Sequence, residues 1–106
     1  MTKTNELVPL TGKQKSYLRG LGHSLKPLLQ LGKAGITDLF IENLNEVLER
    51  HELIKVKLIG NSPLSLKEAA AEFAAKAPCH VAQTIGKTAL LYRPSKENPE
   101  IKIPSA

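Results

Sequence analysis

Hydrophobic residues near the start of the chain recur at intervals of three and four, the period of an amphipathic helix. Leu18, Leu21 and Leu25 follow this spacing and predict a helix over residues 12–22 whose leucines face the core. Thr11 precedes the helix with a hydroxyl that can accept a hydrogen bond from the first turn. We therefore expect a capped N-terminal helix that ends at a glycine.

A short apolar run and a second helical pattern follow. Leucines within residues 28–31 predict a buried strand that stops at Gly32. Thr37 can cap the next helix. The apolar stripe of that helix consists of Phe40, Ile41, Leu44, Val47 and Leu48. Its acidic residues fall mostly on the other side, which predicts a solvated face opposite the core.

The second half of the chain predicts three strands and one helix. These elements occupy residues 53–58, 65–76, 80–85 and 88–93. In the first strand, Lys55 and Lys57 alternate with apolar residues, so one face is buried and the other is basic. Ser65 and Glu68 have the spacing of a capping box at the start of the helix.

The resulting order, α-β-α-β-α-β-β, predicts a single compact α/β domain with a four-stranded mixed sheet. Strand–helix–strand crossovers imply parallel neighbours, and the final hairpin adds an antiparallel pair. We expect a flexible arm over residues 1–10, the domain over 11–94, and an extended, mobile tail over 95–106 that contains two of the chain's prolines.

Composition is that of an ordinary globular domain and excludes several classes of protein. Hydrophobic residues make up 42% of the 106 residues and charged residues 24%, so wholesale disorder is not expected. The single cysteine, Cys79, cannot form an intramolecular disulfide, which fits a reducing cytoplasm. No apolar run reaches the length of a membrane span. The three histidines lack metal-ligand spacing, and we expect no metal and no cofactor.

The net charge of +5 suggests a polyanionic partner, and the charge is unevenly distributed. Residues 1–35 hold six basic residues and one acidic residue, whereas residues 38–52 hold five acidic residues and one arginine. One region of the surface should therefore be distinctly positive.

Gly-Lys-Ala-Gly at residues 32–35 lies between a predicted strand and a predicted helix. Amides at a helix N-terminus carry partial positive charge, and glycine has no side chain to hold a phosphate away. Lys33 adds a formal charge. Such a loop can clamp a nucleic-acid backbone, as the comparable loop of KH domains does. The spacing alone favours the simpler interpretation, in which Gly32 only ends the strand and Gly35 only relieves a tight turn.

The candidate RNA-contacting residues are the loop and the basic side chains that could surround it. They are Gly32, Lys33, Ala34, Gly35, Lys13, Lys15, Arg19, Lys26, Lys55, Lys57, Lys87 and Arg93. Each of the basic residues, taken singly, is also typical of a solvated face, and only their joint excess favours binding. Aromatic residues make up 4% of the chain, so we expect recognition of backbone and shape rather than reading of many bases. Convergent catalytic groups are not evident, and we expect no enzymatic activity.

Three segments resemble one family in the same order along the chain. LGHSLKPLLQLGKAGIT at residues 21–37 resembles the signature of the CRM domain, the chloroplast RNA splicing and ribosome maturation domain, whose bacterial stand-alone members are the YhbY-type proteins. HELIKVKL at 51–58 and IGKTALLYRP at 85–94 also resemble that family. The resemblance covers about residues 10–94. The chain departs at Ser24, where the family favours proline, and in its alanine-rich third helix.

The resemblance implies a fold similar to the C-terminal domain of bacterial translation initiation factor three, and RNA binding through the glycine-x-x-glycine loop. Bacterial members are associated with precursors of the large ribosomal subunit, and plant relatives act in group II intron splicing. We therefore expect a monomeric, cytoplasmic ribosome assembly factor whose partner is ribosomal RNA. The alternatives are an RNA-binding splicing or translation-associated factor, a protein-interaction adapter that uses the acidic face of the second helix, and an enzyme on a small nucleotide.

Overall fold

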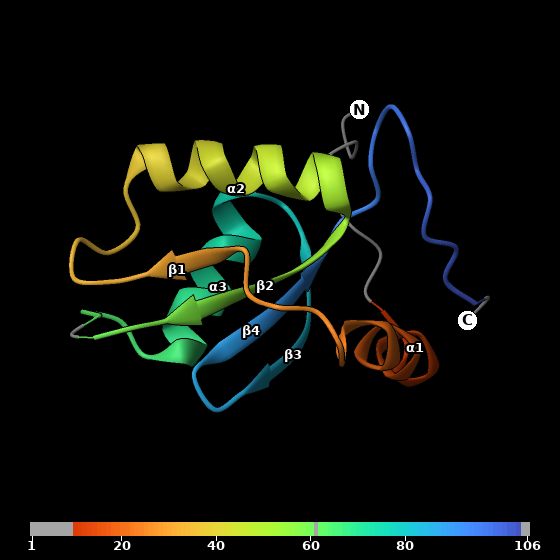
Figure 1. Cartoon of the computed structure of the whole chain (residues 1–106), viewed down its shortest axis with the longest axis horizontal. Helices are drawn as coiled ribbons and strands as arrows, with labels where there is room; N and C mark the ends of the chain where they lie inside the picture. The colour runs from red at the N-terminus through yellow and green to blue at the C-terminus, as the bar shows by residue number, and fades with distance from the viewer. Residues whose placement is uncertain (1–9, 61, 105–106) are drawn as a thin grey trace.

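The computed structural model describes residues 10–60 and 62–104 and confirms the predicted order of elements (Figure 1). The predicted arm over residues 1–10 lies outside the described residues except for Leu10. The elements are α1 (Gly12–Gly22), β1 (Leu29–Leu31), α2 (Asp38–His51), β2 (Leu53–Leu58), α3 (Leu66–Lys76), β3 (His80–Ile85) and β4 (Thr88–Tyr92).

Local sequence signals determine where the three helices begin. Thr11, Thr37 and Ser65 are the N-caps, and each hydroxyl accepts a hydrogen bond from the backbone amide three residues later, at 3.1, 3.0 and 3.2 Å respectively. α1 and α3 carry complete capping boxes. The predicted starts of all three helices are therefore confirmed.

The sheet has the strand order β1-β2-β4-β3. β1 is parallel to β2, as the crossover through α2 predicts, and β4 is antiparallel to both β2 and β3. The prediction of parallel neighbours is wrong for β2 and β3, because β4 lies between them. The physical reason is burial: residues 89–92 of β4 are all buried and suit a central strand, whereas Gln83 and Thr84 place β3 at an edge.

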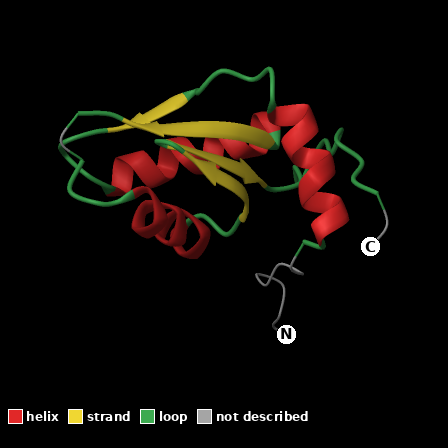
Figure 2. Ribbon diagram, turned by 90° about the horizontal axis from the view of Figure 1, so that it is seen from below, coloured by secondary structure: helices red, strands yellow, loops and turns green. Residues whose placement is uncertain are grey.

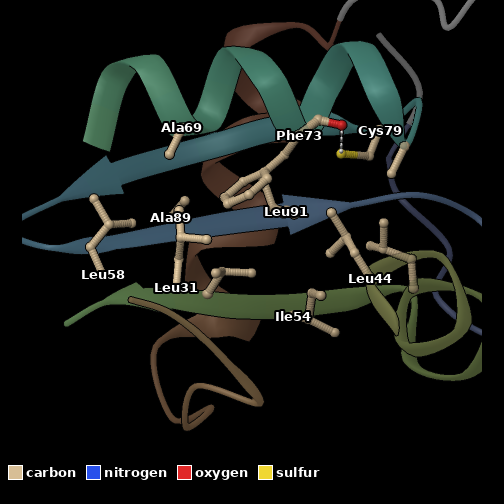
Figure 3. Close-up of a cluster of buried hydrophobic side chains, with 12 residues drawn as sticks. Leu31, Leu44, Ile54, Leu58, Ala69, Phe73, Cys79, Ala89 and Leu91 are labelled. Atoms are coloured by element: carbon tan, nitrogen blue, oxygen red, sulfur yellow. Dashed lines mark hydrogen bonds between the residues drawn. The ribbon is translucent and has the colours of Figure 1, made fainter. Parts of the chain in front are cut away.

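Each face of the sheet has its own hydrophobic cluster. α2 and α3 cover one face, where Phe73 is fully buried in the cluster shown in Figure 3. Its ring stacks on Phe40 with ring centroids 5.6 Å apart. Leu18 of α1 packs against the other face, on Leu90 and Tyr92. The sheet is a single layer with the helices packed along it (Figure 2).

α1 contributes less apolar surface to the core than its leucine spacing predicts. Leu21 and Leu25 are 41% and 37% exposed, so the prediction that they face the core is wrong. α1 meets the sheet through Leu18 and through Gly22, where an added Cβ would lie 2.8 Å from the Leu90 side chain. This close crossing brings the end of α1 directly onto β4 and leaves Leu21 and Leu25 at the rim of the contact.

β1 is an edge strand rather than a buried one. Leu31 is 1% exposed, but Leu28, which precedes the strand, is 51% exposed. β1 has a hydrogen-bonded neighbour on one side only, which is β2. The apolar run therefore supplies one core residue, not the continuous buried segment that the sequence predicts.

The segment after β4 is held in place, contrary to the prediction of a mobile tail. The carboxylates of Glu49 and Glu52 accept hydrogen bonds from the backbone amides of Ser95, Lys96, Glu97, Glu100 and Ile101. The side chains of Ile101 and Ile103 pack on the α1-side cluster. The sequence reading failed here because it assigned the acidic residues of α2 to a solvated face.

These contacts shift the titration of both carboxylates. Hydrogen bonds from the Lys96 amide, the Ser95 hydroxyl and the Glu97 amide lower the pKa of Glu49 to about 2. Burial alone would raise the pKa of Glu52, but its three backbone N–H donors together outweigh burial and hold that pKa below 4.5. Both groups are therefore ionised acceptors in the folded protein at neutral pH.

Candidate nucleic-acid interface

Residues 32–35 form a tight turn at the carboxyl end of β1. The Gly35 N–H donates to the Gly32 carbonyl oxygen at 3.0 Å, and Lys33 and Ala34 are exposed at the tip. Gly35 has a φ of +74°, and an added Cβ would lie 3.2 Å from Pro63 Cγ. The fold therefore requires glycine at position 35.

Gly32 has no such structural requirement. Its φ is not in the left-handed region, and an added Cβ would meet the Ile59 side chain at 3.6 Å, an ordinary van der Waals contact. Backbone conformation and packing therefore explain why position 35 is glycine, but they do not explain why position 32 is glycine.

The N-terminus of α2 opens directly after this turn. Thr37 caps the Phe40 amide, while the amides of Asp38 and Leu39 have no acceptor among the described residues. A shallow hollow of about 330 Å³ runs between the turn and the first turn of α2. The free amides give this end of the helix partial positive charge, and the Asp38 carboxylate in the first turn partly offsets it.

Lys57 and Lys87 lie at the same end of the sheet as the turn. Leu31, the last residue of β1, pairs with Leu58 of β2, and the Leu58 amide donates to the Lys87 carbonyl oxygen at 2.7 Å. Both lysine side chains are exposed. The loop between β1 and α2 and the end of β2 are seen together in Figure 1. Three of the predicted basic residues, including Lys33, thus surround one end of the sheet.

Arg19 and Lys55 meet elsewhere, across a groove of about 660 Å³ between α1 and the sheet. The Lys55 ammonium donates to the Leu25 carbonyl oxygen at 3.0 Å, which fixes its position at the groove wall. Sequence reasoning missed this groove. The only signal was the spacing of the residues that line it from α1, which are Ser16, Arg19, Gly20 and Gly22, and from the C-cap, His23.

The remaining predicted residues are not brought to the turn. Lys26 is exposed beside a separate apolar hollow. Lys13 and Lys15 lie in the first half of α1. Lys15 lies near His80, at the far end of the sheet: burial of His80 is the main cause that lowers its pKa, and the Lys15 charge lowers it further.

Arg93 follows β4 at that same far end and has a structural role. Its guanidinium donates to the Asn45 side-chain oxygen at 2.7 Å and to the Asn45 carbonyl oxygen at 3.1 Å. These bonds tie the end of β4 to α2 and occupy the head group that a phosphate would need. We therefore leave Arg93 out of the interface.

Among the described residues, the other reactive groups do not gather into a site. Burial raises the pKa of the Cys79 thiol to about 11, despite the nearby Arg93 charge, which fits an unreactive side chain. Within residues 10–60 and 62–104, no group of three or more histidine, cysteine, aspartate or glutamate residues could hold a metal ion. Tyr92 is buried, whereas Tyr17 is 42% exposed on α1.

None of the helices in the described part of the chain is both long enough and apolar enough to span a membrane.

Comparison with known proteins agrees with the fold and with the sequence motifs. A family model described as the CRS1 / YhbY (CRM) domain matches residues 10–93. The chain is 42% identical to the "Probable RNA-binding protein YqeI" of Bacillus subtilis, covering 90% of this chain and 99% of that protein. It is 36% identical to an "RNA-binding protein" of Haemophilus influenzae, over 86% of this chain and 92% of the relative.

A solved structure has the same fold. The solution structure of the hypothetical protein SAV1595 from Staphylococcus aureus, described as a candidate RNA-binding protein, has a TM-score of 0.68 and 40% identity. The match covers 90% of this chain and 99% of that one. With the family model spanning all seven elements, the chain belongs to the CRS1/YhbY (CRM) domain family.

Proposed function

We propose that this chain binds RNA, and that it contacts the backbone with the turn at residues 32–35 and the adjacent lysines. The observation that carries the proposal is the arrangement at one end of the sheet: an exposed glycine-bounded turn and unpaired helix amides lie beside Lys33, Lys57 and Lys87. The relatives from Bacillus subtilis and Haemophilus influenzae carry names that describe RNA-binding proteins, which agrees with this chemistry.

The role we propose is non-enzymatic and cytoplasmic: a monomer that binds ribosomal RNA in precursors of the large ribosomal subunit. The family resemblance supports the ribosomal setting. The chain is mainly one domain, since the family model accounts for residues 10–93 of 106.

The adapter alternative is weakened by the structure of α2. Glu49 and Glu52, two of the five acidic residues in the proposed docking face, are already used to hold the segment after β4. A basic protein partner would have to displace those hydrogen bonds. RNA binding is therefore the better-supported function.

Crosslinking in cells, followed by sequencing of the bound RNA, tests the proposal directly. We expect reads concentrated in large-subunit ribosomal RNA and its precursor flanks, and co-sedimentation of the protein with pre-large-subunit particles. A purified protein whose RNA affinity is negligible even at low salt would refute RNA binding. Reads spread over messenger RNA, with no ribosomal enrichment, would refute the ribosomal role and leave RNA binding intact.

A further inference from the structure

A groove beside α1 is not used by the loop-based interface. It lies between α1 and the face of the sheet opposite α2 and α3, and has a volume of about 660 Å³. That is within the range of about 300–1,000 Å³ typical of small-ligand sites. α1 covers only part of this sheet face, because it crosses the sheet at Gly22 against Leu90.

The groove wall on α1 is small and polar rather than apolar. Ser16, Arg19 and Gly20 lie at i, i+3 and i+4 on one face of α1, and the C-cap residue His23 at i+7 continues that face; all four line the groove. A Cβ added at Gly20 would meet nothing within 4 Å, so the space beside it is open. The space between this face of α1 and the sheet is therefore open to a ligand, whereas a leucine at position 20 would fill it.

The sheet side combines an apolar floor with hydrogen-bonding groups. Ile85, which is 64% exposed, supplies apolar surface, and the buried side chain of Leu90 lines the bottom of the groove. Gln83 offers both a donor and an acceptor, and the hydroxyl of Thr88 offers either. Lys55 has one N–H bound to the Leu25 carbonyl oxygen and two left for a ligand.

This combination matches the chemistry of one unpaired nucleotide. A nucleobase has an apolar face and an edge of mixed donors and acceptors, and its phosphate is anionic. The groove lies on the strand face that also carries Lys57, which pairs with Thr88 and leads toward the turn at residues 32–35. A single strand held at the turn could therefore continue across Lys57 into the groove.

We propose that the groove is a subsite for an unpaired base, so that this protein binds single-stranded RNA in preference to duplex. A duplex keeps its bases stacked and paired and cannot place one in the groove. This inference rests on the proposed RNA binding, and it adds the strand class and the residues that select it.

The test fills the groove without disturbing the fold. Gly20→Leu places a side chain in the open space, and Gly12→Leu is the matched control, since Gly12 is on the same helix, has nothing within 4 Å of an added Cβ, and does not line the groove. Binding of a labelled single-stranded ribosomal RNA fragment and of its duplex is measured by fluorescence anisotropy. We expect Gly20→Leu to weaken single-strand binding about tenfold, the equivalent of one lost base contact.

Three comparisons decide the result. Gly12→Leu should bind like the unsubstituted protein, and duplex binding, which uses the turn and its adjacent lysines, should be unchanged in both variants. Gln83→Ala, which leaves the groove open, should weaken single-strand binding about fivefold through one lost hydrogen bond. Melting curves of all three variants check that they fold.

Equal affinity of the unsubstituted protein for single strand and duplex would overturn the inference and leave the proposed RNA binding standing. Single-strand affinity unchanged by both Gly20→Leu and Gln83→Ala would also overturn it, and would leave the groove to a peptide segment. An unsubstituted protein that binds neither RNA would refute the proposed function itself.

Discussion

Reversing the charge at the tip of the turn is the most informative perturbation of this protein. In the double variant Lys33→Asp/Ala34→Asp, both side chains are exposed and the turn is closed by backbone atoms of Gly32 and Gly35. Neither substituted side chain makes a hydrogen bond or ion pair in the described structure. We therefore expect the fold and the melting temperature to remain nearly unchanged.

The expected loss of affinity follows from the electrostatics of an exposed site. One lysine–phosphate attraction is lost and two carboxylates face the phosphates, and each such interaction at about 4 Å in water is worth about 1 kcal/mol. Together they amount to about 3 kcal/mol, or about 100-fold in affinity at low salt. Loss of one phosphate contact should also reduce the slope of log K against log salt by about 0.7 for a single strand.

The assay is fluorescence anisotropy with a ribosomal RNA fragment over a series of salt concentrations. The matched control is Ala75→Asp/Lys76→Asp, which makes the same two replacements on exposed positions of α3. It also breaks the Lys76–Glu72 ion pair of 3.1 Å and places acids at the end of a helix, so it should lose about 1 kcal/mol of stability or less and stay folded. Equal loss of affinity in the two double variants would show that only net charge matters and would refute the role of the turn.

Further predictions concern the stability of the fold. Gly35→Ala should lower the free energy of unfolding by about 1–2 kcal/mol, because of its positive φ and its contact with Pro63, whereas Gly32→Ala should change it by about 0.5 kcal/mol or less, as thermal melts can check. Glu52→Ala should cost about 3 kcal/mol, since three backbone N–H groups lose a charged acceptor, and should speed hydrogen exchange at Glu100 and Ile101; unchanged exchange rates would contradict the anchoring of this segment. The pKa values of Glu49 and Glu52 are lowered in the folded state, so their stabilising contribution is complete above about pH 4.5 and is lost on acidification below it, for Glu49 as the pH falls toward about 2; NMR titration of both carboxyls would detect this.

The elements themselves could be predicted because their signals are local. The side-chain hydroxyls of Thr11, Thr37 and Ser65 each accept a hydrogen bond from the backbone amide three residues later. These caps set where the helices start, and all three are present in the structure. The alternation in β2 likewise separates the buried Val56 from the exposed Lys57. Each of these signals depends on neighbours within one or two turns of the chain.

The interface was predicted only in part. The turn at residues 32–35 and its place before a helix follow from the sequence, as does the family. Which basic residues lie beside the turn does not, because Lys57 and Lys87 reach it through strand pairing while Arg93 is carried to the opposite end and bound by Asn45. The positions of basic residues along the sequence do not show which of them the fold brings to the turn.

By itself, the amino-acid sequence determined the order of helices and strands, their caps, the glycine-bounded turn and the family to which the chain belongs. Only the tertiary structure decided the central position of β4, the exposure of Leu21, the anchoring of residues 95–104 and the groove beside α1. The physical reason is range: capping and periodicity act over a few residues, whereas strand order and helix crossing minimise the exposed apolar surface of the whole domain at once.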